Sequence, residues 1–175
     1  MSPGSLRRRL PGLVLALSAL CTPARADQAA EARTLLQAGR TADAMRSIEQ
    51  ALARQPGDLQ LRFLRGVVLA EQKKTPEAIT QFMQLIQDHP ALPEPYNNLA
   101  MLYSGLGQYD KARIALETAV RHRPDYAAAY ENLGDVYARL AGDAYARALQ
   151  IEAGNRSVPP KLALISELFA AGPAR

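Results

Sequence analysis

Small and bulky apolar residues recur along this chain with a regular period of about 34 residues. In each of the first three units, a small residue is followed 12 positions later by an alanine, and that alanine is followed 12 positions later by a proline. The small residues are Ala32, Gly66, Ala100 and Gly134, the alanines are Ala44, Ala78 and Ala112, and the prolines are Pro56, Pro90 and Pro124. Bulky residues at Leu35, Leu69, Tyr103 and Tyr137 keep the same spacing. In a chain rich in alanine and leucine, this repeat predicts pairs of helices that approach closely at the small residues.

The same spacing predicts where the helices begin and end. Each periodic proline ends a second helix, because proline lacks an N–H and clashes with the preceding turn. Thr41 and Thr75 stand where second helices begin, and we expect each to act as an N-cap, with Pro76 at the first helical position. Gly39 and Gly107 fall in the tight turn within a unit, where glycine can adopt a positive φ.

A helix–turn–helix unit with this period and pattern resembles the tetratricopeptide repeat. The third unit, PEPYNNLAMLYSGLGQYDKARIALETAVRHRP, shows the resemblance best. It has Tyr96, Leu99, Ala100, Tyr103, Ala112, Ala119 and Pro124 at the signature positions of the family. The resemblance implies an all-α, right-handed superhelical α-solenoid. Four repeats are expected in residues 27–158, at about 27–57, 58–91, 92–125 and 126–155.

The fourth unit departs from the pattern in its second half. Its second helix is predicted to follow a turn at Gly142 and Asp143 and to be about five residues shorter than its counterparts, with Gly154 and Asn155 as its stop.

A last helix is predicted from about residue 161 to 171, opened by Pro160. Its apolar face consists of Leu162, Leu164, Ile165, Leu168 and Phe169. Because the end of a solenoid exposes an apolar face that must be covered, we expect residues 159–175 to form a capping helix and tail. The alternative is that this face docks a partner, or the same helix of another chain.

The N-terminal segment 1–26 has the three-part plan of a secretory signal peptide. A basic stretch at 7–9 precedes an apolar run at 13–20, which is shorter than the about 20 residues that span a bilayer. Small residues at Ala24 and Ala26 predict cleavage after Ala26, export to the periplasm of a bacterium, and a mature form without a stable membrane span. Cys21 suggests lipoprotein processing as an alternative, although Leu20 stands before it where a small residue is usual.

The formal net charge of +4 lies within this N-terminal segment. Residues 1–26 hold four arginines and no acidic residue, whereas the rest of the chain has 17 residues of each sign. A basic surface for nucleic acid is therefore not predicted. The single cysteine also provides no internal disulfide.

The resemblance further implies where a partner binds, since the first helices of tetratricopeptide repeats line a concave groove. The predicted groove residues are Arg33, Gln60, Phe63, Val67, Glu94, Asn97, Met101, Glu131, Asp135 and Arg139. Phe63, Val67 and Met101 are expected to form an apolar centre, where a methionine adapts to varied partners.

The fourth unit is expected to give this groove an acidic end at Glu131 and Asp135, partly neutralised by Arg139. Such a groove suits an extended or helical protein segment with apolar anchors and a basic end. Some members of the family clamp the C-terminal carboxylate of a chaperone with basic and amide side chains. This sequence lacks that set, so chaperone-tail binding is not predicted.

No residue pattern indicates catalysis, a metal or a cofactor. His89 and His122 each lie just before a proline at a helix end, and two separated histidines without a cysteine partner do not indicate a zinc site. We therefore expect a small, exported, non-enzymatic scaffold or adaptor that binds a protein or peptide in envelope assembly or maintenance. The alternative is a self-associating structural protein, a weak homo-oligomer that uses the C-terminal apolar helix.

Overall fold

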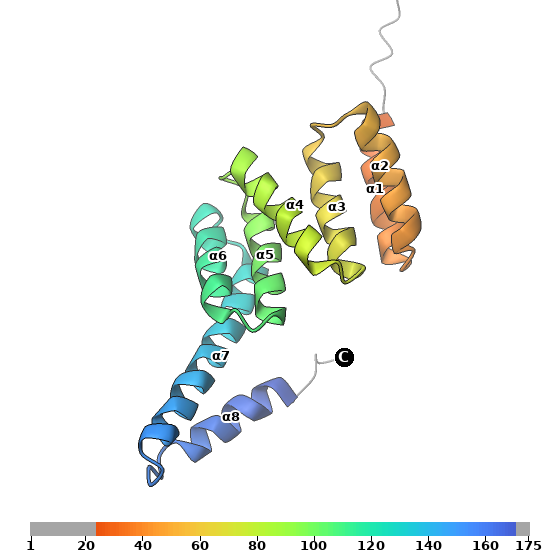
Figure 1. Cartoon of the computed structure of the whole chain (residues 1–175). Helices are drawn as coiled ribbons and strands as arrows, with labels where there is room; N and C mark the ends of the chain where they lie inside the picture. The colour runs from red at the N-terminus through yellow and green to blue at the C-terminus, as the bar shows by residue number, and fades with distance from the viewer. Residues whose placement is uncertain (1–23, 171–175) are drawn as a thin grey trace, which may run out of the picture.

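The computed structural model describes residues 24–170, with side chains from Gln28 onward, and within this range it contains eight α-helices and no strand (Figure 1). The helices are α1 (Ala24–Gln37), α2 (Thr41–Arg54), α3 (Leu59–Glu71), α4 (Thr75–Asp88), α5 (Pro93–Gly105), α6 (Tyr109–His122), α7 (Ala127–Ile151) and α8 (Pro159–Ala170). The predicted all-α fold is confirmed. Most of the predicted signal peptide, including Cys21, lies outside the described residues.

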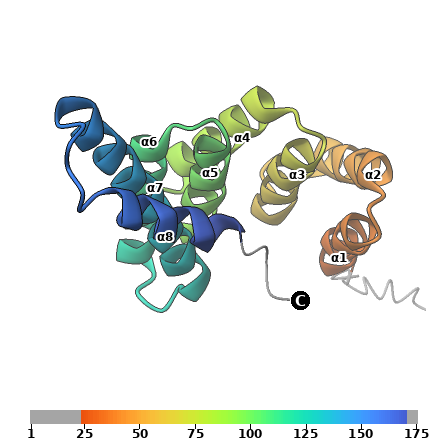
Figure 2. The same ribbon diagram turned by 90° about the horizontal axis from the view of Figure 1, so that it is seen from below.

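Successive helices pack in pairs, and the pairs stack into a solenoid. α1 packs on α2, α3 on α4 and α5 on α6, and each pair packs on the next. α1, α3, α5 and α7 also contact one another in series, whereas α2, α4 and α6 make no such contacts in the described part of the chain. The first helices of the repeats therefore line the inner, concave side (Figures 1 and 2). No helix between residues 24 and 170 has both the length and the apolar character needed to cross a bilayer.

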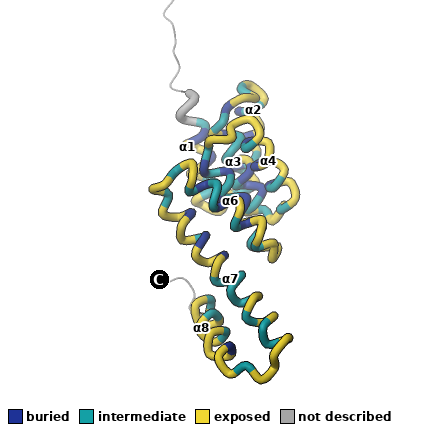
Figure 3. The backbone as a smooth tube through the Cα atoms, turned by 90° about the vertical axis from the view of Figure 1, so that its left-hand side faces the viewer, coloured by how far each residue is buried: buried dark blue, intermediate teal, exposed yellow. Residues whose placement is uncertain are grey.

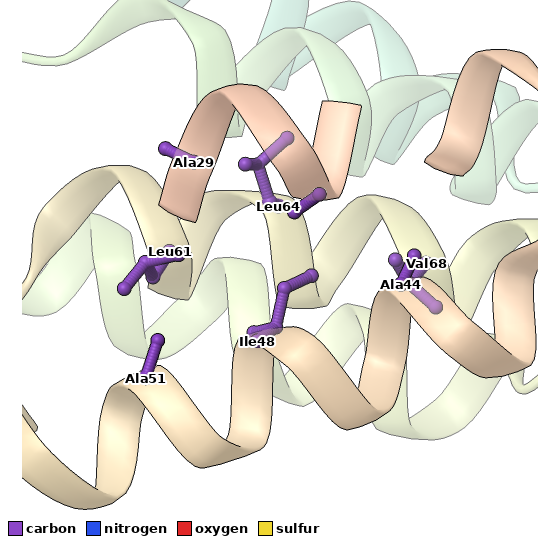
Figure 4. Close-up of a cluster of buried hydrophobic side chains, with 8 residues drawn as sticks. Ala29, Ala44, Ile48, Ala51, Leu61, Leu64 and Val68 are labelled. Carbon is purple, nitrogen blue, oxygen red and sulfur yellow. The ribbon is translucent and has the colours of Figure 1, made fainter. Parts of the chain in front are cut away.

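Small residues at the predicted positions allow the helices of a pair to pack closely. Ala32, Gly66 and Ala100 are buried, as are Ala44, Ala78 and Ala112 in the facing helices. A Cβ added at Gly66 would lie 2.7 Å from the ring of Phe82, so the glycine is required by this contact. In the first core cluster, Ile48 of α2 packs with Leu61 and Leu64 of α3 (Figure 4).

The turn inside each of the first three units depends on one residue with a positive φ. This angle is 70° at Gly39, 58° at Lys73 and 70° at Gly107, at the same position of each repeat. In each turn the next amide reaches back to a carbonyl of the last helical turn, in the pairs Arg40 to Leu35, Lys74 to Leu69 and Gln108 to Tyr103, each at 2.9 Å. This is the Schellman arrangement. The predictions for Gly39 and Gly107 are confirmed, and Lys73 adopts the same conformation at a cost of about 1–2 kcal/mol.

The threonines at the start of α2 and α4 do not cap these helices, which corrects our prediction. Thr41 and Thr75 are the first helical residues, and the N-cap positions belong to Arg40 and Lys74, neither of which makes a side-chain cap bond. The Schellman turn extends directly into the next helix and leaves no room for a separate cap residue. A side-chain cap does occur at α3, where Asp58 accepts hydrogen bonds from the amides of residues 60 and 61.

The fourth unit does not turn, so the predicted separate second helix is wrong. α7 runs unbroken from Ala127 to Ile151, through the turn expected at Gly142. Position 141 corresponds to the positive-φ position of the earlier units, but it is an alanine, for which that conformation is costly. A helix folded back in repeat register would also place Gln150 where the third unit buries Leu116. Continuation of the helix avoids both costs.

The predicted last helix is present as α8, which folds back along α7 (Figures 1 and 2). Val158 is buried at its start, and its inward side continues with the partly buried Leu162, Ile165 and Phe169. Leu164 and Leu168 remain 66% and 54% exposed. Most residues at this end of the molecule are exposed or partly buried, and α8 contains no buried residue (Figure 3). The helix predicted as a cap therefore covers one side of α7 only.

Candidate partner-binding groove

The concave surface of the N-terminal repeats contains a hollow of about 380 Å³, which we call the first hollow. Its lining includes Arg33 of α1, Gln60 and Phe63 of α3, and Glu94 of α5, four of the predicted groove residues. The Phe63 ring is partly buried and packs against the ring of Phe82, with centroids 5.7 Å apart. Arg33 and Gln60 are exposed. The first hollow thus has an apolar floor and a polar rim, which fits an apolar side chain of a ligand.

A second hollow, of about 330 Å³, lies between α5, α6, α7 and the end of α8. It is lined by Met101, Asp135 and Arg139, all predicted groove residues, and also by Ser104 and Phe169. Met101 is 56% exposed, so its flexible thioether is open to a ligand. The guanidinium of Arg139 lies 3.5 Å from the centroid of the Phe169 ring, a cation–π contact that holds the end of α8 at the groove.

One polar pair joins the third repeat to the fourth, and a second pair, within the third repeat, lies against the first residue of the fourth. The Asn132 amide donates to Oδ1 of Asn97 at 2.9 Å, and Asn97 is only 6% exposed. The Arg123 guanidinium donates to Glu94 at 2.7 Å and lies 3.8 Å from the centroid of the Tyr126 ring. Asn97 and Glu94, both predicted to contact a partner, are therefore engaged within the protein. Asn97 stabilises the spacing between the two repeats directly, and Glu94 holds Arg123 against Tyr126.

The remaining predicted residues lie outside both hollows. Val67 is partly buried and packs against the core cluster that contains Phe82. Glu131 is exposed on α7, so Asp135 is the predicted acid that reaches the second hollow. The predicted apolar centre is divided: Phe63 lines the first hollow, Met101 lines the second, and Val67 lines neither.

Sequence reasoning missed two residues that shape this surface. Asn132 stands one repeat after Asn98, and this repeated asparagine could have drawn attention to the inter-repeat bond. Phe169 had no such signal, because its position depends on the unbroken α7 and the return of α8.

Comparison with known proteins agrees with this architecture. Two family models, both described as tetratricopeptide repeat, match residues 29–93 and 69–134 and together span more than half of the chain. The chain belongs to the tetratricopeptide-repeat family.

Two curated relatives illustrate the range of similarity. The chain is 28% identical to the protein ycf37 of Guillardia theta over 138 residues, which cover 73% of this chain and 78% of that protein. It is 32% identical to the tetratricopeptide repeat domain-containing protein PYG7, chloroplastic, of Arabidopsis thaliana over 108 residues. That match covers 57% of this chain and 36% of the Arabidopsis protein.

Solved structures share the solenoid fold. The first TPR domain of human RPAP3 superposes with a TM-score of 0.61 at 15% identity, covering 65% of this chain and 90% of the domain. The second TPR domain of human RPAP3, solved in complex with an HSP70 peptide, gives 0.56 at 16% identity, with 63% and 92% covered. At these identities the likeness concerns the fold.

Proposed function

We propose that this protein is an adaptor that binds a segment of another protein across the two hollows of its concave surface. The observation that carries the proposal is the pair of hollows, which present Phe63 and Met101 to the same side of the solenoid. A bound segment would place one apolar side chain in each, and Asp135 and Arg139 would orient polar groups beside the second. The peptide complex of the RPAP3 domain, which has the same fold, supports the use of such a scaffold for peptide binding.

We further propose that the protein acts in the periplasm, without catalysis or a cofactor, in assembly or maintenance of the cell envelope. The charge segregation, apolar run and Ala-x-Ala site of residues 1–26 support export. Mass spectrometry of the protein purified from its host checks this part of the proposal. A chain that begins at Asp27 is expected, and one that retains residues 1–26 contradicts it.

Site-specific crosslinking in intact cells tests the binding proposal. The chain offers a matched pair of methionines: Met101 is 56% exposed in the second hollow, and Met83 is 53% exposed on α4, on the outer side. With a photoreactive phenylalanine analogue at either position, position 101 is expected to trap a discrete protein partner that position 83 does not. Adding Asp135→Arg should reduce the yield at position 101. The same adducts from both positions, or none from position 101, would refute the assignment of the concave side as the binding surface.

A second candidate function is self-association through α8, and the observation in its favour is the exposure of Leu164 and Leu168. Sedimentation of the double variant Leu164→Ser, Leu168→Ser against the parent chain tests it. Loss of a self-associated species supports this seam, and an unchanged mass distribution excludes it.

A further inference from the structure

α7 exposes a face that a second helix covers in the other repeats. Three residues of this face, Tyr130, Gly134 and Tyr137, are the repeat counterparts of Tyr96, Ala100 and Tyr103. Ala100 is 0% exposed because α5 packs against α6. In the fourth unit Tyr130 and Tyr137 are 50% and 47% exposed, and a Cβ at Gly134 would meet nothing within 4 Å. The fourth repeat thus presents a helix-packing face without its helix.

The described part of this chain does not supply the missing helix. α7 continues where the second helix would have folded back, and α8 packs on another side of α7, at Arg139 and Gly142. The hydroxyl of Tyr137 does donate to Glu117 of α6 at 3.1 Å, but about half of the Tyr137 side chain remains accessible.

The face continues along α7 from Tyr130 to Ile151 as an uncharged stripe, which we call the α7 stripe; within it Ala141 and Ala148 are partly buried. It consists of Tyr130, Gly134, Tyr137, Ala141, Ala144, Ala148 and Ile151. These residues are spaced alternately by four and three, which is the a/d spacing of a coiled coil sustained over three heptads. Gly134, Ala141 and Ala148 occupy every second position and allow a partner helix to approach closely. Ile151, at the end, is 76% exposed.

We propose that two copies of this chain pair through the α7 stripe, with their α7 helices side by side and parallel. The charged residues that flank the stripe favour a second copy of this chain as the partner, and a parallel arrangement of the two α7 helices. In a parallel pair, Arg147 of each copy faces Glu152 of the second copy, which gives two opposite-charge contacts. An antiparallel pair over the same span would set Glu131 against Glu152, two like charges. All three residues are exposed and accessible for such contacts.

This pairing is independent of the proposed groove function. The first hollow has no α7 residue in its lining, and the second meets α7 at Asp135 and Arg139. The α7 stripe follows Gly134 and Tyr137 on another side of the helix. Loss of pairing would therefore leave the crosslink at Met101 in place, and failure of the groove proposal would leave the pairing intact.

Sedimentation equilibrium of the full chain tests the pairing. The parent chain is expected to form a species of twice the chain mass as concentration rises. Ala141→Arg should raise the dissociation constant by more than about 100-fold, because two unpaired guanidinium groups would be buried in one seam. Ala146→Arg, an exposed alanine of the same helix outside the stripe, is the matched control and should have little effect. Circular dichroism checks that both variants stay folded.

Disulfide formation tests the direction. In a Cys21→Ser chain, Ala148→Cys, near the end of the α7 stripe, should crosslink two copies under mild oxidation, because a parallel two-fold pair brings the same position of both copies together. An antiparallel pair that sets Glu131 against Glu152 would instead place residue 148 beside residue 135. Ala146→Cys should not. In sedimentation, a strict monomer overturns the proposal, and so does a dimer that Ala141→Arg leaves unchanged. A dimer that is lost in the double variant Leu164→Ser, Leu168→Ser but retained in Ala141→Arg assigns the seam to α8. No crosslink at 148, or equal crosslinking at 148 and 146, overturns the parallel arrangement.

Discussion

Gly66 and Gly134 hold equivalent repeat positions, yet alanine is expected to have opposite effects at the two sites. A Cβ at Gly66 would lie 2.7 Å from Cε1 and 2.8 Å from Cζ of Phe82. The Phe82 side chain is 0% exposed, so it has little space to move away. A Cβ at Gly134 meets nothing within 4 Å, because the second helix of that unit is absent from its face. Both glycines lie inside helices, in α3 and α7.

The expected magnitudes follow from two opposing contributions. Alanine in place of a helical glycine contributes about 0.5–1 kcal/mol of stability, since it reduces the backbone entropy lost on folding. Gly134→Ala should show this gain. Overpacking a filled core costs about 1–3 kcal/mol, so Gly66→Ala should lower the free energy of unfolding by about 1–2 kcal/mol after the same gain.

Urea denaturation followed by far-UV circular dichroism measures both changes as shifts of the midpoint at unchanged slope. In a Phe82→Leu background, where the ring is removed, Gly66→Ala should be clearly less destabilising, and the double-mutant cycle then isolates the contact. If both glycine variants shift the midpoint in the same direction by similar amounts, the covered face at Gly66 and the open face at Gly134 are wrongly assigned.

Two further predictions concern the contacts around the groove. Asn132→Ala leaves the buried Oδ1 of Asn97 without its donor and should cost about 1–3 kcal/mol in equilibrium denaturation, whereas leucine at both positions should restore most of the loss. A double variant as unstable as the single one would contradict this explanation. Phe169→Ala removes the ring beneath Arg139 and should speed amide exchange in α8, lowering its opening free energy by about 0.5–2 kcal/mol. The exposed Leu168→Ala is its control, and equal effects of the two would contradict a specific role of the ring.

The first three repeats could be predicted from the sequence because each depends on local rules that recur. A small residue in the first helix and an alanine in the facing helix determine close packing, and Gly39 and Gly107 supply the positive φ of their turns. Lys73 was less evident, since only its place in the repeat, and not its residue type, indicates that conformation.

The candidate site was harder to predict, because residues at groove positions can contact a partner or pack within the protein itself. Phe63 and Asn97 occupy groove positions of the repeat, but one packs partly on Phe82 and the other is buried by its bond to Asn132. Exposure at such a position depends on the neighbouring repeat as well as on the local pattern. Phe169 reaches the second hollow through a fold-back of the chain that no periodic signal describes.

The end of the solenoid shows how one position can determine two surfaces. At position 141 an alanine stands where glycine or a strained lysine makes the turn in the other units, and α7 continues as a single helix of 25 residues. Because α7 extends beyond the preceding repeat, α8 can return along it and bring Phe169 to the second hollow. The same extension leaves the α7 stripe without a covering helix. Since α8 and the stripe occupy different sides of α7, a partner in the groove and a second copy on the stripe can bind at the same time.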